Sequence, residues 1–382
     1  MRRAIVLARR GEGRVEPNPM VGCVIVRDAR IIGEGYHRRY GGSHAEVEAL
    51  KRCGRRARGA TLYVTLEPCC HFGKTPPCVD ALISAGIRKV VVALRDPNPI
   101  VSGRGLRKLK AAGIKVQTGV EAEAAARLAA PFATLMRLGR PYVIAKWAQD
   151  AHGGMTRPTG VSPWISCETS RRWAHRLRAR VDAIIVGSGT VLRDDPMLTA
   201  RGVVRKRVAS RVVLDSRLRT PLESGLVSTA ADVPTLVFTT PAMAKANKAR
   251  RLAAKSVHVV GVRARRGALD LRAVLGNLAA RGAMNVLVEG GPTLLAGFFE
   301  ADLIDEANVF VAPRRRRPPT AENGAAPFRS RGLTRTTAGL TPVEFQARPS
   351  GRDIHYRIVL KRNHAPPGAD TGTRLAWPLA QV

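Results

Sequence analysis

Aromatic residues are scarce in this chain, and it contains no long hydrophobic run. Phe, Trp and Tyr make up 4% of the 382 residues, whereas surfaces that bind nucleic acids usually interleave such rings with clustered basic side chains. No apolar run approaches the roughly 18 residues needed to cross a bilayer, and the apolar stretch at 4–8 is too short for a secretory signal. We therefore expect a cytoplasmic protein without a membrane span.

Acidic residues are also few. Against 64 Lys and Arg there are 29 Asp and Glu, which gives a formal net charge of +35. One interpretation is attraction to the phosphates of a nucleic acid. The other is a compositional bias, which the spread of 52 Arg and 12 Lys over nearly every segment favours. We therefore expect no nucleic-acid partner, while small phosphorylated substrates would suit such a surface.

Cysteine is limited to six residues, and a long cytoplasmic chain does not use such a set as a disulfide framework. Cys69, Cys70 and Cys78 fall within ten residues of one another beside a histidine, so metal chemistry is expected there. Cys23 and Cys53 stand alone, and we interpret them as thiols of the hydrophobic core.

Strand and helix signals alternate along the chain, which predicts sheets covered by helices in an α/β protein. The length, at roughly 150 residues per domain, and the apolar content of 45% fit two or three folded domains. We expect a first domain at 1–120, a connecting helix at 121–140 and a second domain at 141–362. A tail rich in Pro, Gly and Thr at 363–382 is expected to be disordered.

The expected elements follow this division. In the first domain we predict strands at 21–26, 31–35, 60–66, 89–94 and 114–120, the first two as a hairpin, and helices at 44–53 and 79–85. In the second domain we predict strands at 142–148, 183–187, 211–214, 235–239, 257–262 and 286–289. Its helices are expected at 168–180, 269–281 and 293–299, and closing antiparallel strands at 307–311 and 353–360.

The strongest chemical signal is the pair His44 and Glu46, followed by Cys69 and Cys78. One imidazole and two thiolates form a three-ligand zinc set that leaves a position for water, whose pKa the metal lowers towards neutrality. Glu46 can sit beside the metal and carry protons, as in zinc deaminases with H-x-E followed by P-C. The alternative is a closed structural site with Cys70 as fourth ligand, although adjacent cysteines rarely both bind one metal.

Two glycine-containing stretches follow predicted strands of the second domain, GSGTVLRDDP at 187–196 and EGGPTLL at 289–295. Glycines at a strand end let the backbone approach a phosphate, and a helix N-terminus attracts the anion. A tight strand-to-helix turn is the alternative, since neither stretch is a GxGxxG or a Walker A motif.

Several motifs resemble the bifunctional riboflavin-biosynthesis deaminase/reductase family. They are PNPMVG at 17–22, HAE at 44–46, TLEPCCHFGKTPPC at 65–78 and RDPNP at 95–99 for the deaminase half. KWA at 146–148, SPWI at 162–165, HRLR at 175–178, DS at 215–216 and the two glycine stretches resemble the reductase half. The resemblance extends from residue 1 to about residue 360, and the long spacing between Cys69 and Cys78 is typical of that family.

The resemblance implies a fold and a reaction sequence. The fold would be a cytidine-deaminase-like three-layer α/β/α domain followed by a dihydrofolate-reductase-like α/β domain. The first domain would use one zinc ion to deaminate a phosphoribosylated diaminopyrimidinone by hydrolysis. The second would use NADPH to reduce the ribosyl group to ribityl.

The resemblance also implies roles for individual residues. His44, Cys69 and Cys78 would bind zinc, and Glu46 would be the catalytic proton shuttle. Deaminase substrate positions are Asn18, His37, His71, Lys74, Asp96 and Asn98, of which Asn18, Asp96 and Asn98 also fit ordinary turns. Reductase substrate positions are Ser162, Arg178, Leu198, Arg201 and Glu289, the two arginines suiting a phosphate. Cofactor positions are Ala148, Trp164, Thr190, Asp194, Ser216, Gly291, Pro292, Thr293, Leu294, Leu295, Ala296 and Gly297.

Lys146 is a candidate catalytic residue of the reductase, with an ordinary snorkelling lysine as the alternative. Two stretches depart from the family pattern, since Asp150-Ala151-His152-Gly153 replaces Ser-x-Asp-Gly and the run 314–317 replaces a Gly-rich region with four arginines. Cys70 stands where Ser is more usual.

Other functions stay open on the sequence alone. A zinc-dependent base deaminase acting on a nucleic acid such as tRNA, with a basic accessory domain, is one alternative, and it predicts salt-dependent binding. A zinc-stabilised binding protein without catalysis is another. The oligomeric state is also open, with a homo-oligomer among the options.

Overall fold

The computed structural model describes residues 1–73, 75–99, 101–151, 153–155, 164–265, 267–313 and 342–360 of the 382. Lys74, His152, Ser162, the run 314–317 and the predicted tail lie outside these ranges. The chain divides into two compact units, Met1–Pro141 with Ala279–Met284, and Tyr142–Leu278 with the described residues from Asn285 onward. Within the described ranges, none of the helices has the length and apolarity that a membrane span requires.

The first unit is built on a five-stranded sheet in the order β2-β1-β3-β4-β5. β1 pairs antiparallel with β2 and β3, whereas β3, β4 and β5 are parallel. The strands are Gly22–Arg27 (β1), Arg30–Tyr36 (β2), Thr61–Leu66 (β3), Lys89–Leu94 (β4) and Lys115–Thr118 (β5). The predicted strands and their hairpin are confirmed.

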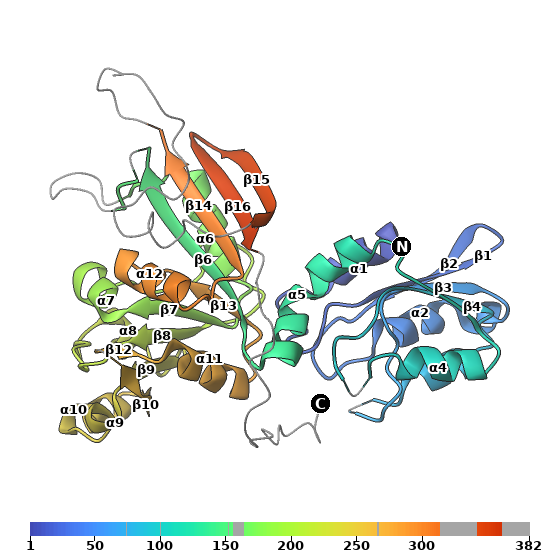
Figure 1. Cartoon of the computed structure of the whole chain (residues 1–382), viewed down its shortest axis with the longest axis horizontal. Helices are drawn as coiled ribbons and strands as arrows, with labels where there is room; N and C mark the ends of the chain where they lie inside the picture. Colours follow the sequence, from blue (N-terminus) through green and yellow to red (C-terminus); the bar gives the residue numbers. More distant parts are fainter. Residues whose placement is uncertain are drawn as a thin grey trace. The chain divides into compact units, whose positions relative to one another are not determined.

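Helices cover both faces of this sheet and make a three-layer α/β/α unit (Figure 1). The helices α2, α3 and α4 pack on one face, and α1 and α5 pack on the other. They span Arg2–Ala8 (α1), Ala45–Cys53 (α2), Cys78–Ser84 (α3), Arg104–Ala111 (α4) and Ala122–Leu138 (α5), with short 3-10 turns at Arg9–Gly11 and Gly54–Ala57. The sequence predicted neither α1 nor α4.

Two glycines let helices approach the sheet closely. A Cβ atom at Gly22 of β1 would lie 2.0 Å from the carbonyl oxygen of Ala4 in α1. On the other face, a Cβ atom at Gly35 of β2 would lie 2.2 Å from the carbonyl oxygen of Ala45 in α2. Since real Cβ contacts are longer, only glycine allows these helices to sit where they do.

The main core of this unit lies between the sheet and α2, α3 and α4. Cys23 and Cys53 belong to it and are buried, as predicted for core thiols. The residues packed with them are aliphatic and come from every strand and from all three helices, which explains the β-branched and Leu-rich runs of the sequence. Fully buried examples are Ile25, Leu62, Val64, Leu82, Val90 and Leu109.

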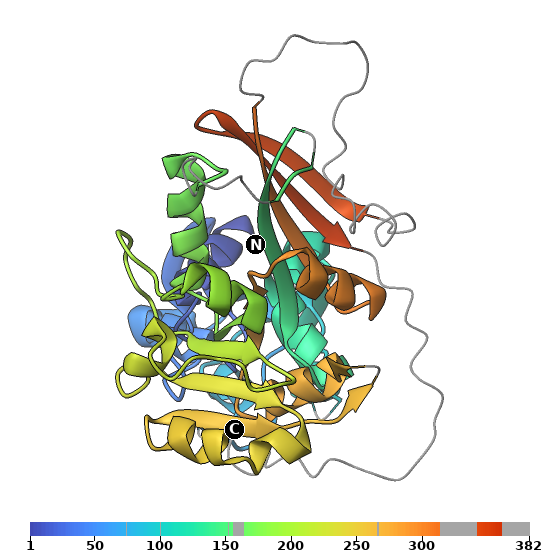
Figure 2. The ribbon, with the colours of Figure 1, turned by 90° about the vertical axis from the view of Figure 1, so that its left-hand side faces the viewer.

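The second unit is built on a nine-stranded sheet in the order β10-β9-β8-β7-β13-β6-β14-β16-β15. The strands from β10 to β14 are parallel, and β16 and β15 continue antiparallel at one edge. Figure 2 shows how this sheet twists from β10 to the β15–β16 hairpin. The strands are Tyr142–Asp150 (β6), Ala183–Gly187 (β7), Ser210–Leu214 (β8), Thr235–Thr239 (β9), Val257–Gly261 (β10), Asn285–Val288 (β13), Glu306–Ala312 (β14), Pro342–Ser350 (β15) and Asp353–Leu360 (β16).

The remaining elements connect these strands. Ala264–Arg265 (β11) and Ala268–Leu269 (β12) form a separate small hairpin. The helices are Glu168–Arg178 (α6), Ser188–Asp194 (α7), Gly225–Ser228 (α8), Pro241–Ala244 (α9), Asn247–Ala253 (α10), Leu271–Ala280 (α11) and Pro292–Glu300 (α12). The predicted antiparallel pair is confirmed, because β14 and β16 are antiparallel. β14 is also parallel to β6, and β15, which the sequence did not predict, pairs with the other side of β16.

The parallel strands in the middle of this sheet bring four loops together. Because β8, β7, β13 and β6 are neighbours and parallel, their carboxyl ends meet at one edge of the sheet. Ligands of open α/β sheets usually bind outside such an edge. The predicted cofactor and substrate residues of the second domain mostly follow these strand ends.

Candidate active sites

The three predicted metal ligands converge in the first unit. His44 lies at the start of α2, Cys69 follows β3, and Cys78 begins α3. The Nδ1 atom of His44 lies 3.2 Å from Sγ of Cys78 and 3.5 Å from Sγ of Cys69, and the ligand atoms all lie within 4.8 Å of one another. Cys70 is not part of this group, so the predicted alternative of Cys70 as fourth ligand is not supported by the geometry.

This donor set fits zinc. Tetrahedral zinc bonds of about 2.1 Å to nitrogen and about 2.3 Å to sulfur place a nitrogen and a sulfur ligand about 3.6 Å apart, close to the separations found. A hydrogen bond from Cys78 and the nearby His44 imidazole outweigh burial and lower the pKa of Cys69 to about 4, which favours the thiolate that a metal needs. The same hydrogen bond, together with burial, raises the pKa of Cys78, so a metal ion would have to displace the Cys78 proton. Three ligands leave room for a fourth, as in catalytic zinc sites.

Glu46 lies on the first turn of α2 and is only 3% exposed to solvent. Burial raises the pKa of its carboxyl group to about 7, an effect that His44 partly offsets. A carboxyl group with a pKa near neutrality can accept and return a proton at physiological pH. The predicted proton shuttle is therefore placed beside the metal ligands in a suitable environment.

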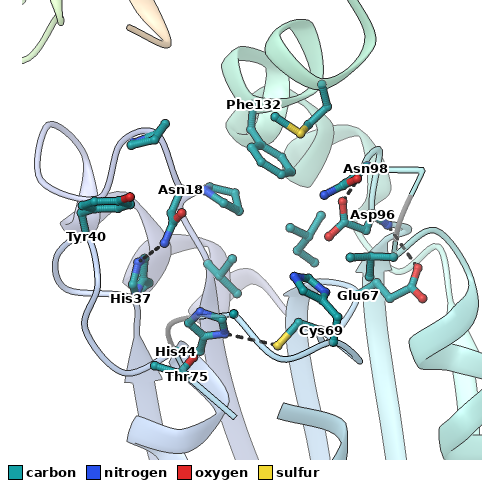
Figure 3. Close-up of a pocket in the computed structure, with 18 of the residues that line it drawn as sticks. Asn18, His37, Tyr40, His44, Glu67, Cys69, Thr75, Asp96, Asn98 and Phe132 are labelled. Carbon is teal, nitrogen blue, oxygen red and sulfur yellow. Dashed lines mark hydrogen bonds between the residues drawn. The ribbon is translucent and has the colours of Figure 1, made fainter. Parts of the chain in front are cut away.

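A pocket of about 150 Å³ opens above these residues (Figure 3). Its position follows from the topology, because the loops after the parallel strands β3 and β4 meet at one edge of the sheet. Cys78 is not among the residues that line the pocket, although its sulfur lies close to His44 and Cys69, and Lys74 lies outside the described residues. The remaining predicted deaminase residues all line it, namely Asn18, His37, His44, Glu46, Cys69, His71, Asp96 and Asn98.

His37 and Asn18 form one polar edge of the pocket. Nδ1 of His37 lies 3.1 Å from the carbonyl oxygen of Ser43, so this nitrogen carries the proton and donates it. Nε2 then accepts from the amide nitrogen of Asn18 at 3.2 Å. Burial lowers the pKa of His37, which keeps the ring neutral. The pair fixes the Asn18 amide so that its oxygen can accept a hydrogen bond from an amino group.

Asp96 and Asn98 form the opposite polar edge, on the loop after β4 (Figure 3). Oδ1 of Asp96 accepts from the backbone nitrogen of Asn98 at 2.8 Å, and burial raises the pKa of Asp96 to about 7. Buried Glu67 holds this loop, because its carboxylate accepts from the backbone nitrogens of Asp96 at 3.2 Å, Gly103 at 2.9 Å and Leu106 at 3.2 Å. The turn chemistry predicted for Asp96 and Asn98 thus coexists with a place in the pocket.

The third side of the pocket was not predicted. Phe132, Leu135 and Met136 of α5 line it, although the sequence indicated only a connecting helix there. These residues also pack with Leu66 at the end of β3 in a small apolar cluster. Their spacing of three and four residues marks one face of a helix, but such a face predicts burial without revealing that part of it borders a cavity.

In the second unit, the predicted substrate residues Arg178 and Glu289 form a buried ion pair. Nε and Nη2 of Arg178 donate to the two carboxylate oxygens of Glu289 at 2.7 and 2.6 Å. Nζ of Lys146 lies 3.9 Å from the same carboxylate. Burial alone would raise the pKa of Glu289, but Arg178 and Lys146 lower it to about 2. Burial lowers the pKa of Lys146, and Glu289 partly offsets this effect.

Two further substrate positions lie near this pair. Leu198 is buried with a positive φ of 51°, and Thr199 after it presents its carbonyl oxygen to Nη1 of Arg178 at 3.4 Å. The backbone nitrogen of Arg201 donates to Nδ1 of His175 at 3.2 Å. The structure thus gathers Lys146, Arg178, Leu198, Arg201 and Glu289, while Ser162 lies outside the described residues.

The predicted cofactor positions lie mainly at the carboxyl edge of the second sheet. Ala148 is near the end of β6 on the same face as Lys146, Thr190 is in α7 directly after β7, and Ser216 follows β8. The segment 291–297 contains the start of α12 after β13, with Gly291 as its N-cap. Trp164 is 53% exposed beneath the guanidinium of Arg171, and exposed Asp194 pairs with neighbouring Arg193 at 2.9 Å.

Comparison with known proteins identifies the family. The model of the cytidine and deoxycytidylate deaminase zinc-binding region matches residues 1–94, and the model of the RibD C-terminal domain matches residues 141–315. The riboflavin biosynthesis protein RibD of Aquifex aeolicus is 44% identical over 314 residues, which are 82% of this chain and 86% of that protein. The chain belongs to the RibD family.

Solved RibD structures agree. A RibD structure from Acinetobacter baumannii is 35% identical, covers 94% of this chain and 98% of its own, and has a TM-score of 0.78. The diaminohydroxyphosphoribosylaminopyrimidine deaminase/5-amino-6-(5-phosphoribosylamino)uracil reductase of Thermotoga maritima is 34% identical, covers 94% and 97%, and has a TM-score of 0.77. The predicted family and fold class, a cytidine-deaminase-like domain followed by a dihydrofolate-reductase-like domain, are confirmed.

Proposed function

We propose that this RibD protein carries out two consecutive steps of riboflavin biosynthesis. The first unit would hydrolyse the amino group from a phosphoribosylated diaminopyrimidinone, and the second would reduce the ribosyl group of the product to ribityl. The observation that carries the proposal is the convergence of His44, Cys69 and Cys78 under a pocket that also contains buried Glu46. The membership of the RibD family supplies the substrate class.

Deamination needs a nucleophile and proton transfer. His44, Cys69 and Cys78 would hold a zinc ion, which would lower the pKa of water and so provide a nucleophile at neutral pH. Glu46 transfers the two protons of the attacking water in turn. The first goes to the ring nitrogen next to the attacked carbon, and the second goes to the amino group, which leaves as ammonia while the hydroxyl oxygen becomes a carbonyl group. The amide oxygen of Asn18 accepts hydrogen bonds from amino groups of the heterocycle and so orients the ring. Asp96 and Asn98 bind the ribosyl hydroxyls.

For the second step we propose NADPH as the nicotinamide cofactor, which would supply the hydride for the opened sugar carbon. Arg217 and Arg219 are exposed and lie one and three residues after Ser216, and their charge suits the additional phosphate that distinguishes NADPH from NADH. Arg178 and Arg201 bind the substrate phosphate, while Glu289 holds the Arg178 guanidinium in place. Lys146 holds a proton on Nζ for the sugar oxygen that becomes a hydroxyl group.

Two assays test the two steps separately. For deamination, ammonia release from the diaminopyrimidinone is compared between wild-type protein and Glu46→Gln, with zinc content measured in both. We expect the substitution to keep zinc and to lower kcat by roughly 100-fold or more, the usual contribution of an acid-base group. Unchanged kcat with zinc retained contradicts the shuttle role.

For reduction, oxidation of NADPH and of NADH is followed with the deaminated product as substrate. We expect kcat/KM to favour NADPH, and to favour it less in the double variant with Arg217→Ala and Arg219→Ala. Equal use of the two cofactors by the wild-type protein would contradict the choice of NADPH. An absence of oxidation with either cofactor would contradict the reductase function.

A further inference from the structure

Helix α5 forms the side of the deaminase pocket that lies farthest from the metal ligands. None of the sequence motifs that resemble the family lies in this helix. Figure 3 shows Phe132 across the pocket from His44 and Cys69, with its ring on the pocket side of α5. Phe132 is 8% exposed and Leu135 is 3% exposed. We call Phe132, Leu135 and Met136 the apolar wall, since none of these side chains offers a strong hydrogen-bonding group.

The polar groups of the pocket lie elsewhere. Asn18 and His37 form one edge, and Asp96 and Asn98 form the opposite edge (Figure 3). The reactive groups, His44 and Cys69 with Glu46, lie at the base. A flat heterocycle has the same distribution, because its donors and acceptors lie in the ring plane while its two faces are apolar π surfaces.

We propose that Phe132, supported by Leu135 and Met136, covers the face of the pyrimidine ring that points away from the metal ligands. This inference rests on the proposed deamination. In this arrangement the nucleophile approaches one face, while the apolar wall contacts the other and excludes water from it. Phe132 is then a positioning residue that selects flat rings, and it takes no part in the proton transfers.

The arrangement makes a specific kinetic prediction. The face of the ring that Phe132 contacts is nearly the same in the substrate and in the deaminated product, since only one exocyclic group differs. A contact that is equally strong before and during the reaction lowers KM without changing kcat. Loss of the ring should therefore raise KM, and it should weaken product inhibition by the same factor.

The test compares wild-type protein with Phe132→Leu, which keeps an apolar, helix-compatible side chain but removes the aromatic face. KM and kcat for ammonia release are measured, and binding of the deaminated product is measured by calorimetry. We expect KM and the product Kd both to rise roughly tenfold, within the range found when a base loses an aromatic stacking partner, while kcat and zinc content stay unchanged. Phe132→Tyr should restore both constants.

Leu128→Ala is the matched control, because Leu128 is buried on the same helix at 9% exposure and does not line the pocket. It should lower Tm but leave KM unchanged. Equal changes in KM for Leu128→Ala and Phe132→Leu, or a fall in kcat with KM unchanged, would overturn the role of Phe132. So would an unaltered product Kd in Phe132→Leu.

Failure of the proposed function gives a different result. If wild-type, zinc-loaded protein binds the product without releasing ammonia from the substrate, deamination is refuted, and the calorimetric comparison alone still decides the role of Phe132. If the wild-type protein neither binds nor reacts, both proposals fail. If it reacts normally and Phe132→Leu matches it in KM and product Kd, only the apolar wall is refuted.

Discussion

Replacing Glu289 with Gln tests whether the buried charges of the second unit stabilise one another. The substitution keeps the shape of the side chain but removes the negative charge that Arg178 and Lys146 share. The side chains of these two cations are only 15% and 18% exposed, so water cannot replace the carboxylate effectively. We expect a large loss of stability at neutral pH.

The magnitude follows from the pKa of Glu289. Burial raises this pKa, yet the attraction to Arg178 and Lys146 outweighs burial and lowers it from 4.5 to about 2. Since one pKa unit corresponds to about 1.4 kcal/mol, ionised Glu289 contributes about 3 kcal/mol to the free energy of unfolding. Removing one partner of a buried ion pair typically costs about 3–5 kcal/mol, which agrees.

The pH dependence has a defined sign. Because the folded pKa is depressed, the stabilisation is fully present above the ordinary pKa of 4.5 and is lost as the pH falls from 4.5 towards about 2. Denaturant unfolding of wild-type protein and Glu289→Gln should therefore differ by about 3 kcal/mol at pH 7 and converge on acidification.

The control is Glu123→Gln, since Glu123 is 93% exposed and pairs with Arg127 at 3.8 Å on the surface. It should unfold like the wild-type protein at every pH. Equal stability of Glu289→Gln and wild type at pH 7, or a difference that does not shrink in acid, would refute the reasoning.

Three further predictions concern the first unit and the helices. Cys78→Ser should lower zinc binding well below one ion per chain, whereas Cys70→Ser should retain the zinc, because Cys70 is outside the ligand group. The zinc content of both variants is measured by metal analysis after dialysis. Loss of zinc from both variants would contradict the ligand assignment. Gly35→Ala should destabilise the protein by about 1–3 kcal/mol or more, since its Cβ atom would lie 2.2 Å from the Ala45 carbonyl oxygen; an unchanged Tm would show that α2 can move away at little cost. Gly276 lies in α11, where a new Cβ atom would have open space around it. Because alanine favours a helix more than glycine does, Gly276→Ala should raise the free energy of unfolding by about 0.5–1 kcal/mol. A fall in Tm would contradict this expectation.

Regular sequence patterns predicted much of the fold. The strand Lys89–Leu94 was predicted with its observed ends, because it is a continuous β-rich run between a glycine turn and a proline-containing loop. The helix Arg104–Ala111 was missed, since its two leucines are surrounded by Arg and Lys. The strand Pro342–Ser350 was missed because its two prolines argue against a strand, although it lies at the sheet edge, where proline is tolerated.

The candidate sites were predictable where chemistry limits the residue type. Only a few side chains bind zinc, so His44, Cys69 and Cys78 could be predicted as ligands from spacing and resemblance, and the structure brings the three together. The function of Glu67 could not, because its partners are backbone nitrogens that the chain brings together only on folding. Phe132 could not be distinguished from an ordinary core residue for a similar reason.

The place of α5 affects how the two halves of RibD proteins can be separated or exchanged. A fragment that ends at residue 120 keeps all three metal ligands but lacks the helix that carries Phe132. Such a fragment would leave the heterocycle exposed to water on one side. Recombination between relatives should therefore place the junction after Pro141, so that each deaminase half retains its own helix.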